Sequence, residues 1–256
     1  MNPPILFILL AESGATVAVY ILLIAGPLLA LLFFYLWRNA KRTRDLMTAT
    51  ETSPIGQLTE GPAEVCGLTA TSEEPLISPW RQQPCVHYCF HVQQKRSSTN
   101  SKGHTTHHWV TYIKDEKTLP FLVKDETGQT VVDTSKIKFV INQDRFSRSG
   151  LMDDADTDLQ QLLETRYSKK TKGWIFNKTL KYTETALELN EEVYVFGDAS
   201  RLGGGWVLSD GKMPLIVSDK GGAAIEKRIE RKVTWFKVLT VLSAAAGVIG
   251  LFMLLA

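Results

Sequence analysis

Apolar residues gather at the two ends of this chain, and a longer segment of mixed polar and apolar residues separates them. Residues 15–37 contain no charged side chain, and neither do residues 238–256. A bilayer core of about 30 Å needs about 20 apolar residues in a helix, so we predict a transmembrane helix over each range. Pro27 lies within the first range, where a membrane helix tolerates it.

Two other interpretations of these apolar ranges fit the sequence less well. A cleaved signal peptide begins with basic residues and has a shorter apolar core, whereas residues 1–4 carry no basic side chain. A buried core helix is the alternative for the second range, but basic residues before a long apolar stretch favour a membrane span. Small residues spaced four apart predict close packing against the first helix or against another copy of the chain. They are Ser243, Ala246, Gly247 and Gly250.

Basic residues flank both apolar ranges on the side of the middle region. They are Arg38, Lys41, Arg42 and Arg44 after the first range and Lys227, Arg228, Arg231 and Lys232 before the second. The positive-inside rule therefore places the middle region in the cytoplasm and both termini on the outer side of the membrane. We expect this membrane to be the inner (plasma) membrane. We expect these side chains to meet anionic lipid head groups, with a role in topology alone as the alternative.

The middle region reads as short strands separated by turns, with a single amphipathic helix at 153–168 and an exposed hairpin loop at 95–108. This pattern predicts a membrane-anchored α+β protein, mostly β, with a small antiparallel barrel or sandwich between two transmembrane helices. The expected strands are 63–71, 85–93, 109–113, 121–125, 130–132, 136–141, 180–187, 193–196, 206–209 and 215–218.

Six segments follow from these patterns. We expect a short outer N-terminus (1–14), the first transmembrane helix (15–37), a basic juxtamembrane segment and linker (38–62), a β-rich cytoplasmic domain (63–222), a basic juxtamembrane helix (223–237) and the second transmembrane helix (238–256).

Charge and cysteine content narrow the function classes. Residues 46–226 hold 20 Lys and Arg against 24 Asp and Glu, a net charge of −4. A nucleic-acid-binding domain is expected to carry a basic patch, so we expect no nucleic-acid partner. The three cysteines are Cys66, Cys85 and Cys89, and a cytoplasmic domain is expected to keep them reduced.

Metal-ligating residue types alternate at 85–91. The period of a strand would place Cys85, His87, Cys89 and His91 on one face, where zinc or copper is conceivable. Residues two apart on a strand lie about 6.5–7 Å from each other, so four of them do not reach one ion. Two neighbours together with the histidines of the following loop would be needed, and a strand face with no metal is the favoured interpretation. No nucleophile motif appears, so no catalytic residue is assigned.

Five short motifs follow one another in an order that resembles the GIDE domain. They are PLISP at 75–79, PCVHY at 84–88, PFLVKDETG at 120–128, YTE at 182–184 and VYVFG at 193–197. The resemblance covers roughly residues 60–220 and the two-helix layout. This domain lies next to the membrane in mitochondrial RING-type E3 ubiquitin ligases, and stand-alone versions occur in prokaryotes.

The resemblance implies ubiquitin ligation, but the sequence departs from the family pattern. A RING needs about eight Cys and His ligands in paired short spacings, and this sequence has no Cys-x2-Cys pair. We therefore expect a non-catalytic membrane scaffold that binds membrane lipids and another membrane or membrane-associated protein. The alternatives are E3 ligase-like activity, for instance through a separately encoded RING partner, or a metal or thiol site on residues 85–91.

Overall fold

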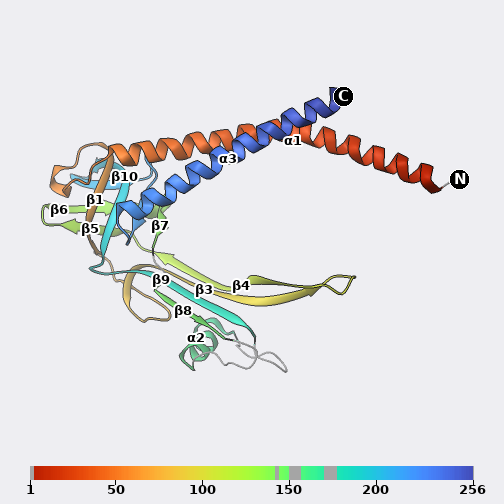
Figure 1. Cartoon of the computed structure of the whole chain (residues 1–256). Helices are drawn as coiled ribbons and strands as arrows, with labels where there is room; N and C mark the ends of the chain where they lie inside the picture. Colours follow the sequence, from red (N-terminus) through yellow and green to blue (C-terminus); the bar gives the residue numbers. More distant parts are fainter. Residues whose placement is uncertain (1–2, 142–143, 150–156, 170–177, 256) are drawn as a thin grey trace. The chain divides into compact units, whose positions relative to one another are not determined.

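The computed structural model describes residues 3–141, 144–149, 157–169 and 178–255 (Figure 1). The chain divides into two compact units. One contains the two terminal segments, up to Ala49 and from Ala223, and the other is Thr50–Gly222.

The terminal unit consists of two long helices, α1 (Pro3–Ala49) and α3 (Gly222–Leu255). Both are long and apolar enough to cross a membrane, over Val19–Ala49 and Ile225–Leu255. Their most apolar windows are only 6% and 11% buried, so neither is the covered core helix of a soluble domain. The predicted pair of apolar helices around a β-rich domain is present. A bend in α1 is visible in Figure 1, and Pro27 lies inside this helix, where it removes a backbone donor.

Five strands of the second unit close into a barrel. Its strands are β1 (Gly61–Ala70), β5 (Phe121–Asp125), β6 (Gly128–Val132), β11 (Gly205–Ser209) and β10 (Glu192–Leu202). Because β1 pairs with both β5 and β10, the order β1-β5-β6-β11-β10 returns to its start. Strands β12 (Ile216–Ser218) and β7 (Lys138–Val140) continue the sheet from β10. Val65, Val123, Val195 and Leu208 are among the residues of the buried core.

A second sheet has the order β2-β3-β9-β8, with β4 also paired to β3. Its strands are β2 (Leu76–Ile77), β3 (Pro84–Thr99), β4 (Thr105–Thr118), β8 (Arg145–Arg148) and β9 (Leu180–Glu188). Helix α2 (Thr157–Tyr167) packs on one face, where Leu159 and Leu163 join Phe90 and Tyr182 in a buried cluster. Val86, near the start of β3, belongs to the barrel core, so this strand connects the two cores.

The mostly β fold class is confirmed, but several predicted elements differ. The hairpin loop predicted at 95–108 is wrong, because β3 and β4 extend through most of it and the turn is confined to about Asn100–His104. Its side chains are nearly all exposed, so the segment shows no alternation of polar and apolar residues.

The segment 38–62 is partly helical, since α1 runs to Ala49 and a short 3-10 helix, η1, covers Ile55–Gln57. A second 3-10 turn, η2, covers Thr134–Lys136. The acidic residues 153–156 of the predicted helix lie outside the described residues.

Candidate functional site

A β-bulge separates the four metal-ligating types on β3. Across β9, Cys85 pairs with Glu188 and His87 pairs with Leu187, so one residue of β3 is inserted between them. Cys85 consequently joins Tyr88 in a buried cluster on the α2 face. The expectation that all four side chains share one face is therefore wrong at Cys85, while His87, Cys89 and His91 keep the alternating register.

His87 is a buried residue with an internal partner. The residue is 3% exposed, its ring stacks on Phe139 at a centroid distance of 3.8 Å, and its Nδ1 shares a hydrogen bond of 2.8 Å with the Thr118 hydroxyl. Burial lowers the pKa of His87 to about 4, against the opposing effect of nearby Glu116. The imidazole is therefore neutral near pH 7 and is held as part of the core.

The thiols of this region are free cysteines in an environment that disfavours the thiolate. Burial raises the pKa of Cys85 to about 12, with Glu184 and Glu188 adding to the effect. Burial also raises the pKa of Cys89, as does the carboxylate of Glu116. A thiol with a raised pKa is a poor nucleophile at neutral pH.

His91 completes the set and is half-buried. Its Nε2 lies 3.1 Å from the Thr111 hydroxyl. Burial and the charges of Lys114 and Lys181 lower the pKa of His91. Among the residues that the structure describes, no three His, Cys, Asp or Glu side chains are grouped so as to hold a metal ion. The favoured interpretation, a strand face with no metal, and its alternative, zinc or copper at residues 85–91, both stay predictions.

A buried carboxylate holds the turn between β2 and β3. Glu184 is fully buried and accepts hydrogen bonds from the backbone N–H groups of Trp80 (2.6 Å) and Arg81 (2.9 Å). Burial raises the pKa of Glu184, and those two donors oppose the shift. Glu184 belongs to the YTE motif, and its two donors lie in the turn that follows the PLISP motif. This side chain therefore joins the two motifs.

Arg81 extends this contact to two further acids. Its Nη1 lies 2.6 Å from Glu188 and 3.5 Å from Asp144. Asp144 in turn accepts a 2.6 Å hydrogen bond from the backbone N–H of Ala186. Burial raises the pKa of Asp144. The pattern of the sequence did not single out Arg81 or Asp144, because a tertiary fold is needed to bring them to β9.

The PFLVKDETG motif has a comparable role in the barrel. One oxygen of Asp125 accepts from the backbone N–H groups of Thr127 and Gly128 and from the Thr127 hydroxyl, at 2.7–2.8 Å. The other oxygen accepts from the Ile55 N–H at 2.7 Å. Although burial opposes it, these donors hold the pKa of Asp125 below its usual value. One carboxylate therefore fixes both the β5–β6 turn and η1.

Helix α2 is tied to its sheet by a polar group around Asp115. Tyr167 donates to Asp115 at 2.7 Å, and Arg166 lies 3.4 Å from the same carboxylate. Arg166 also donates to the Tyr88 hydroxyl at 3.0 Å. Burial raises the pKa of Tyr88 to about 12. These polar side chains hydrogen-bond to one another and attach α2 to the second sheet.

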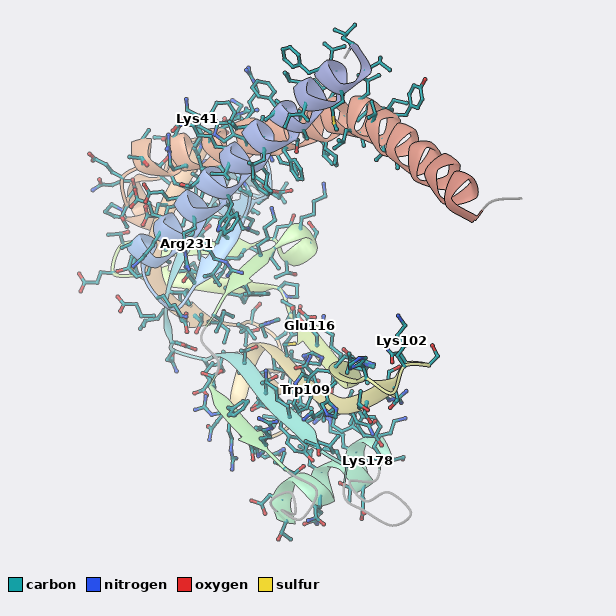
Figure 2. All side chains as sticks on the ribbon, turned by 45° about the vertical axis from the view of Figure 1, so that its right-hand side comes forward. Lys41, Lys102, Trp109, Glu116, Lys178 and Arg231 are labelled. Atoms are coloured by element: carbon teal, nitrogen blue, oxygen red, sulfur yellow. The ribbon has the colours of Figure 1, made fainter. Side chains whose placement is uncertain are left out.

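The predicted membrane-surface residues lie on the two long helices. All are exposed except Arg44, which is half-buried and pairs with Asp45 at 2.6 Å. Lys41 lies 5.7 Å from the centre of the Trp37 ring. Figure 2 labels Lys41 on α1 and Arg231 on α3.

Three of the four predicted helix-packing residues meet α1. A Cβ atom added to Gly26 would lie 2.7 Å from the backbone nitrogen of Gly247 and 3.2 Å from the carbonyl oxygen of Ser243. One added to Gly250 would lie 2.9 Å from the nitrogen of Leu23. Ala246 is half-buried. The backbones of α1 and α3 therefore approach closely where both helices carry glycine.

Comparison with known proteins gives a single finding. The model of the GIDE family, described as E3 ubiquitin ligase, matches residues 91–254, which is well over half of the chain. No curated protein matches, and neither does any solved structure.

Proposed function

The chain belongs to the GIDE family, and from this premise we propose that it is a non-catalytic scaffold, anchored in the membrane by α1 and α3, that binds a partner protein at the cytoplasmic face. The partner is another membrane or membrane-associated protein, and the membrane is the inner (plasma) membrane. A prokaryotic stand-alone version of the domain fits this role.

The observation that carries the proposal is the position of the basic residues. Both helices are apolar enough to span a bilayer, and each carries exposed Lys and Arg at the end that joins the β-rich unit. Positive residues at those ends favour retention of the adjoining domain in the cytoplasm. Anchoring then confines partner binding to the membrane surface.

The chemistry of the described residues supports a non-catalytic role. Burial shifts the pKa values of His87, Glu184 and Asp144, and each of these side chains is hydrogen-bonded to a neighbouring structural element. Perturbed groups at functional sites usually face a cleft. Here they connect strands and turns of the β-rich unit, which is what a rigid binding platform requires.

Family membership favours one second candidate, E3 ligase-like activity. The family description names an E3 ubiquitin ligase. Zinc-bound RING modules use paired cysteines at short spacing, and this sequence contains three cysteines, at 66, 85 and 89. Ligation would then need a RING on a partner, with this chain positioning it at the membrane.

The test is affinity capture of the full chain from crosslinked membranes, compared with a chain in which an unrelated soluble domain replaces residues 50–222. We expect the full chain to recover a partner at saturable stoichiometry, with none recovered by the replacement. Purified full chain, mixed with ubiquitin, its activating and conjugating enzymes and ATP, is expected to transfer no ubiquitin. Transfer by the chain alone, or recovery of the same proteins by both chains, contradicts the proposal.

A further inference from the structure

Among the described residues of the β-rich unit, one face of the second sheet is left largely uncovered. Helix α2 covers the face that carries Leu180 and Tyr182, which are fully buried. Lys181, which lies between these two residues on β9, points to the opposite face and is half-buried. The described residues of that face are at least partly exposed along most of its length, and the buried pair His87 and Leu187 lies at the barrel end.

Strand register brings cations from four strands onto this open face. Lys181 of β9 lies opposite Arg148 of β8 and opposite Gln93 of β3. Lys95 lies two residues beyond Gln93, on the same face, and pairs with Trp109 of β4. Lys114 of β4 pairs with His91, also on this face. These positions are spread over 87 residues of sequence, so they do not form a run of basic residues in the chain.

Two exposed aromatic rings lie among these cations. Phe146 is 54% exposed and Trp109 is 36% exposed. The Arg148 guanidinium lies 5.2 Å from the centre of the Trp109 ring, and the Lys181 ammonium lies 5.8 Å from that of Phe146. Glu116, an acid on the same face, is paired with Lys114 at 2.6 Å. The remainder of the face therefore has a positive character with apolar rings in it.

The same face continues along a projecting ribbon. Strand β9 pairs with β3 as far as Gln94, whereas β3 and β4 go on pairing with each other from Lys95–Trp109 to Thr99–Thr105. A two-stranded ribbon without a core is marginally stable on its own in water. Its sequence from Gln93 to Ile113 contains no acidic residue. Figure 2 shows Lys102 at its tip, with Trp109 and Glu116 further along β4.

We propose that this cationic face, defined by Lys95, Arg148 and Lys181 with Trp109 and Phe146, docks on an anionic lipid surface. It is separate from the basic residues of α1 and α3, and it rests on the membrane anchoring proposed above. Each Lys or Arg near an anionic leaflet strengthens association about fivefold, while Trp and Phe favour the head-group level. Two anchors in the same chain keep lipid at high effective concentration, so weak docking suffices.

Other anionic partners fit the observations less well. Exposed aromatic rings beside cations on a sheet are also used to stack single-stranded nucleic acid. The net charge of −4 for residues 46–226 opposes the approach of nucleic acid and of an anionic membrane alike, so it does not separate the two. Lipid is held beside the domain by covalent connection to the anchors, whereas nucleic acid is not.

The experiment places the full chain in lipid nanodiscs, one set of phosphatidylcholine and one of phosphatidylcholine with phosphatidylglycerol. An environment-sensitive fluorophore is attached at Ser97→Cys, on the ribbon, with Cys66 and Cys89 changed to Ser; Cys85 is fully buried. A head-group-labelled lipid quencher reports docking. We expect quenching in the anionic discs, little in the zwitterionic discs, and loss of quenching as salt is raised.

Matched variants assign the effect to the face. Lys95→Gln with Arg148→Gln is expected to lower the docked-to-undocked ratio about 30-fold. Lys124→Gln with Lys138→Gln removes the same charge from exposed positions of the first sheet, on β5 and β7, and is expected to leave the ratio unchanged. The comparison of the two lipid compositions keeps all charged residues, so it decides the question even where a variant fails to fold.

Several outcomes would overturn the inference. Equal quenching in the two lipid compositions would show that the face does not bind an anionic surface. Equal effects of the two double variants would show that docking does not depend on this face. Displacement of the probe signal by single-stranded RNA, with none caused by anionic lipid, would assign the face to nucleic acid. A chain that leaves the discs altogether would instead contradict the membrane anchoring, which distinguishes the two failures.

Discussion

Single carboxylates explain why two of the recognised motifs contain an acid. Glu184 closes the turn before β3 by accepting two backbone donors, and Asp125 closes the β5–β6 turn while holding η1. Both residues were visible in the sequence as parts of motifs. Their roles were not, because the donors of Trp80 and Ile55 come from segments 104 and 70 positions away. Such contacts depend on the tertiary fold.

His87 predicts how stability depends on pH. In the unfolded chain an imidazole takes up a proton as the pH falls through 6.5, whereas burial lowers the pKa of folded His87 to about 4. The free energy of unfolding should therefore decrease as the pH falls from about 6.5 to about 4, by up to about 3 kcal/mol from this group. Urea unfolding of the full chain in detergent at pH 7.5, 5.5 and 4.5 measures it.

The control for this prediction is His87→Asn, which keeps a polar group near Thr118. Glu184 and Asp144, whose raised pKa values act in the opposite direction on acidification, titrate in both proteins. The difference between the two proteins then isolates the histidine. An identical pH dependence in the two would show that the pKa of His87 is the same in the folded and unfolded states, which contradicts the prediction.

At the scale of elements, alternation predicted the existence of strands better than their faces or ends. The strand predicted at 85–93 is present, but the bulge beside Val86 moves Cys85 to the opposite face. A bulge leaves no mark in the polar and apolar pattern, because both faces of β3 are buried near the barrel. The sequence predicts a loop at residues 95–108, since exposed strands without a covered face do not alternate.

The two long helices give the prediction at this scale. Gly247→Leu should destabilise the pairing of α1 with α3 by about 1–3 kcal/mol, because Pro27 Cδ lies 3.0 Å from the position of an added Cβ. Unfolding of the full chain by increasing dodecyl sulfate, followed by helix circular dichroism, measures the change. Ile249→Leu, at a position that is 53% exposed, is the matched control. Equal stability of the two variants would mean that this close approach does not hold the helices.

At the scale of the whole molecule, charge was predicted in its overall distribution and missed in its local arrangement. The basic residues of the helix flanks form runs in the sequence and were found directly. The cationic face of the second sheet was missed, because its members come from β3, β4, β8 and β9 and become neighbours only through strand pairing. A net charge of −4 for residues 46–226 therefore did not exclude a basic surface on the domain.

The charge at the helix flanks also predicts how the chain is oriented. With Cys66 and Cys89 changed to Ser, Ser101→Cys on the ribbon should react with a membrane-impermeant maleimide in vesicles whose cytoplasmic side faces outward, and not in vesicles of the opposite sidedness. Changing the four basic residues after the first apolar range to Gln weakens the asymmetry that sets orientation, so a mixed population is expected. Those residues are Arg38, Lys41, Arg42 and Arg44.

The matched control removes four lysines that lie far from both apolar ranges in the sequence and should leave the orientation uniform, because the rule counts charges near the membrane ends. They are Lys117, Lys124, Lys136 and Lys138. If the chain with unaltered flanks is labelled at Ser101→Cys only in vesicles whose non-cytoplasmic side faces outward, the β-rich unit lies outside the cytoplasm. The assignment of reduced thiols and a cytoplasmic partner would then lose its basis, whereas the lipid-docking test in nanodiscs, which have no sidedness, would still apply.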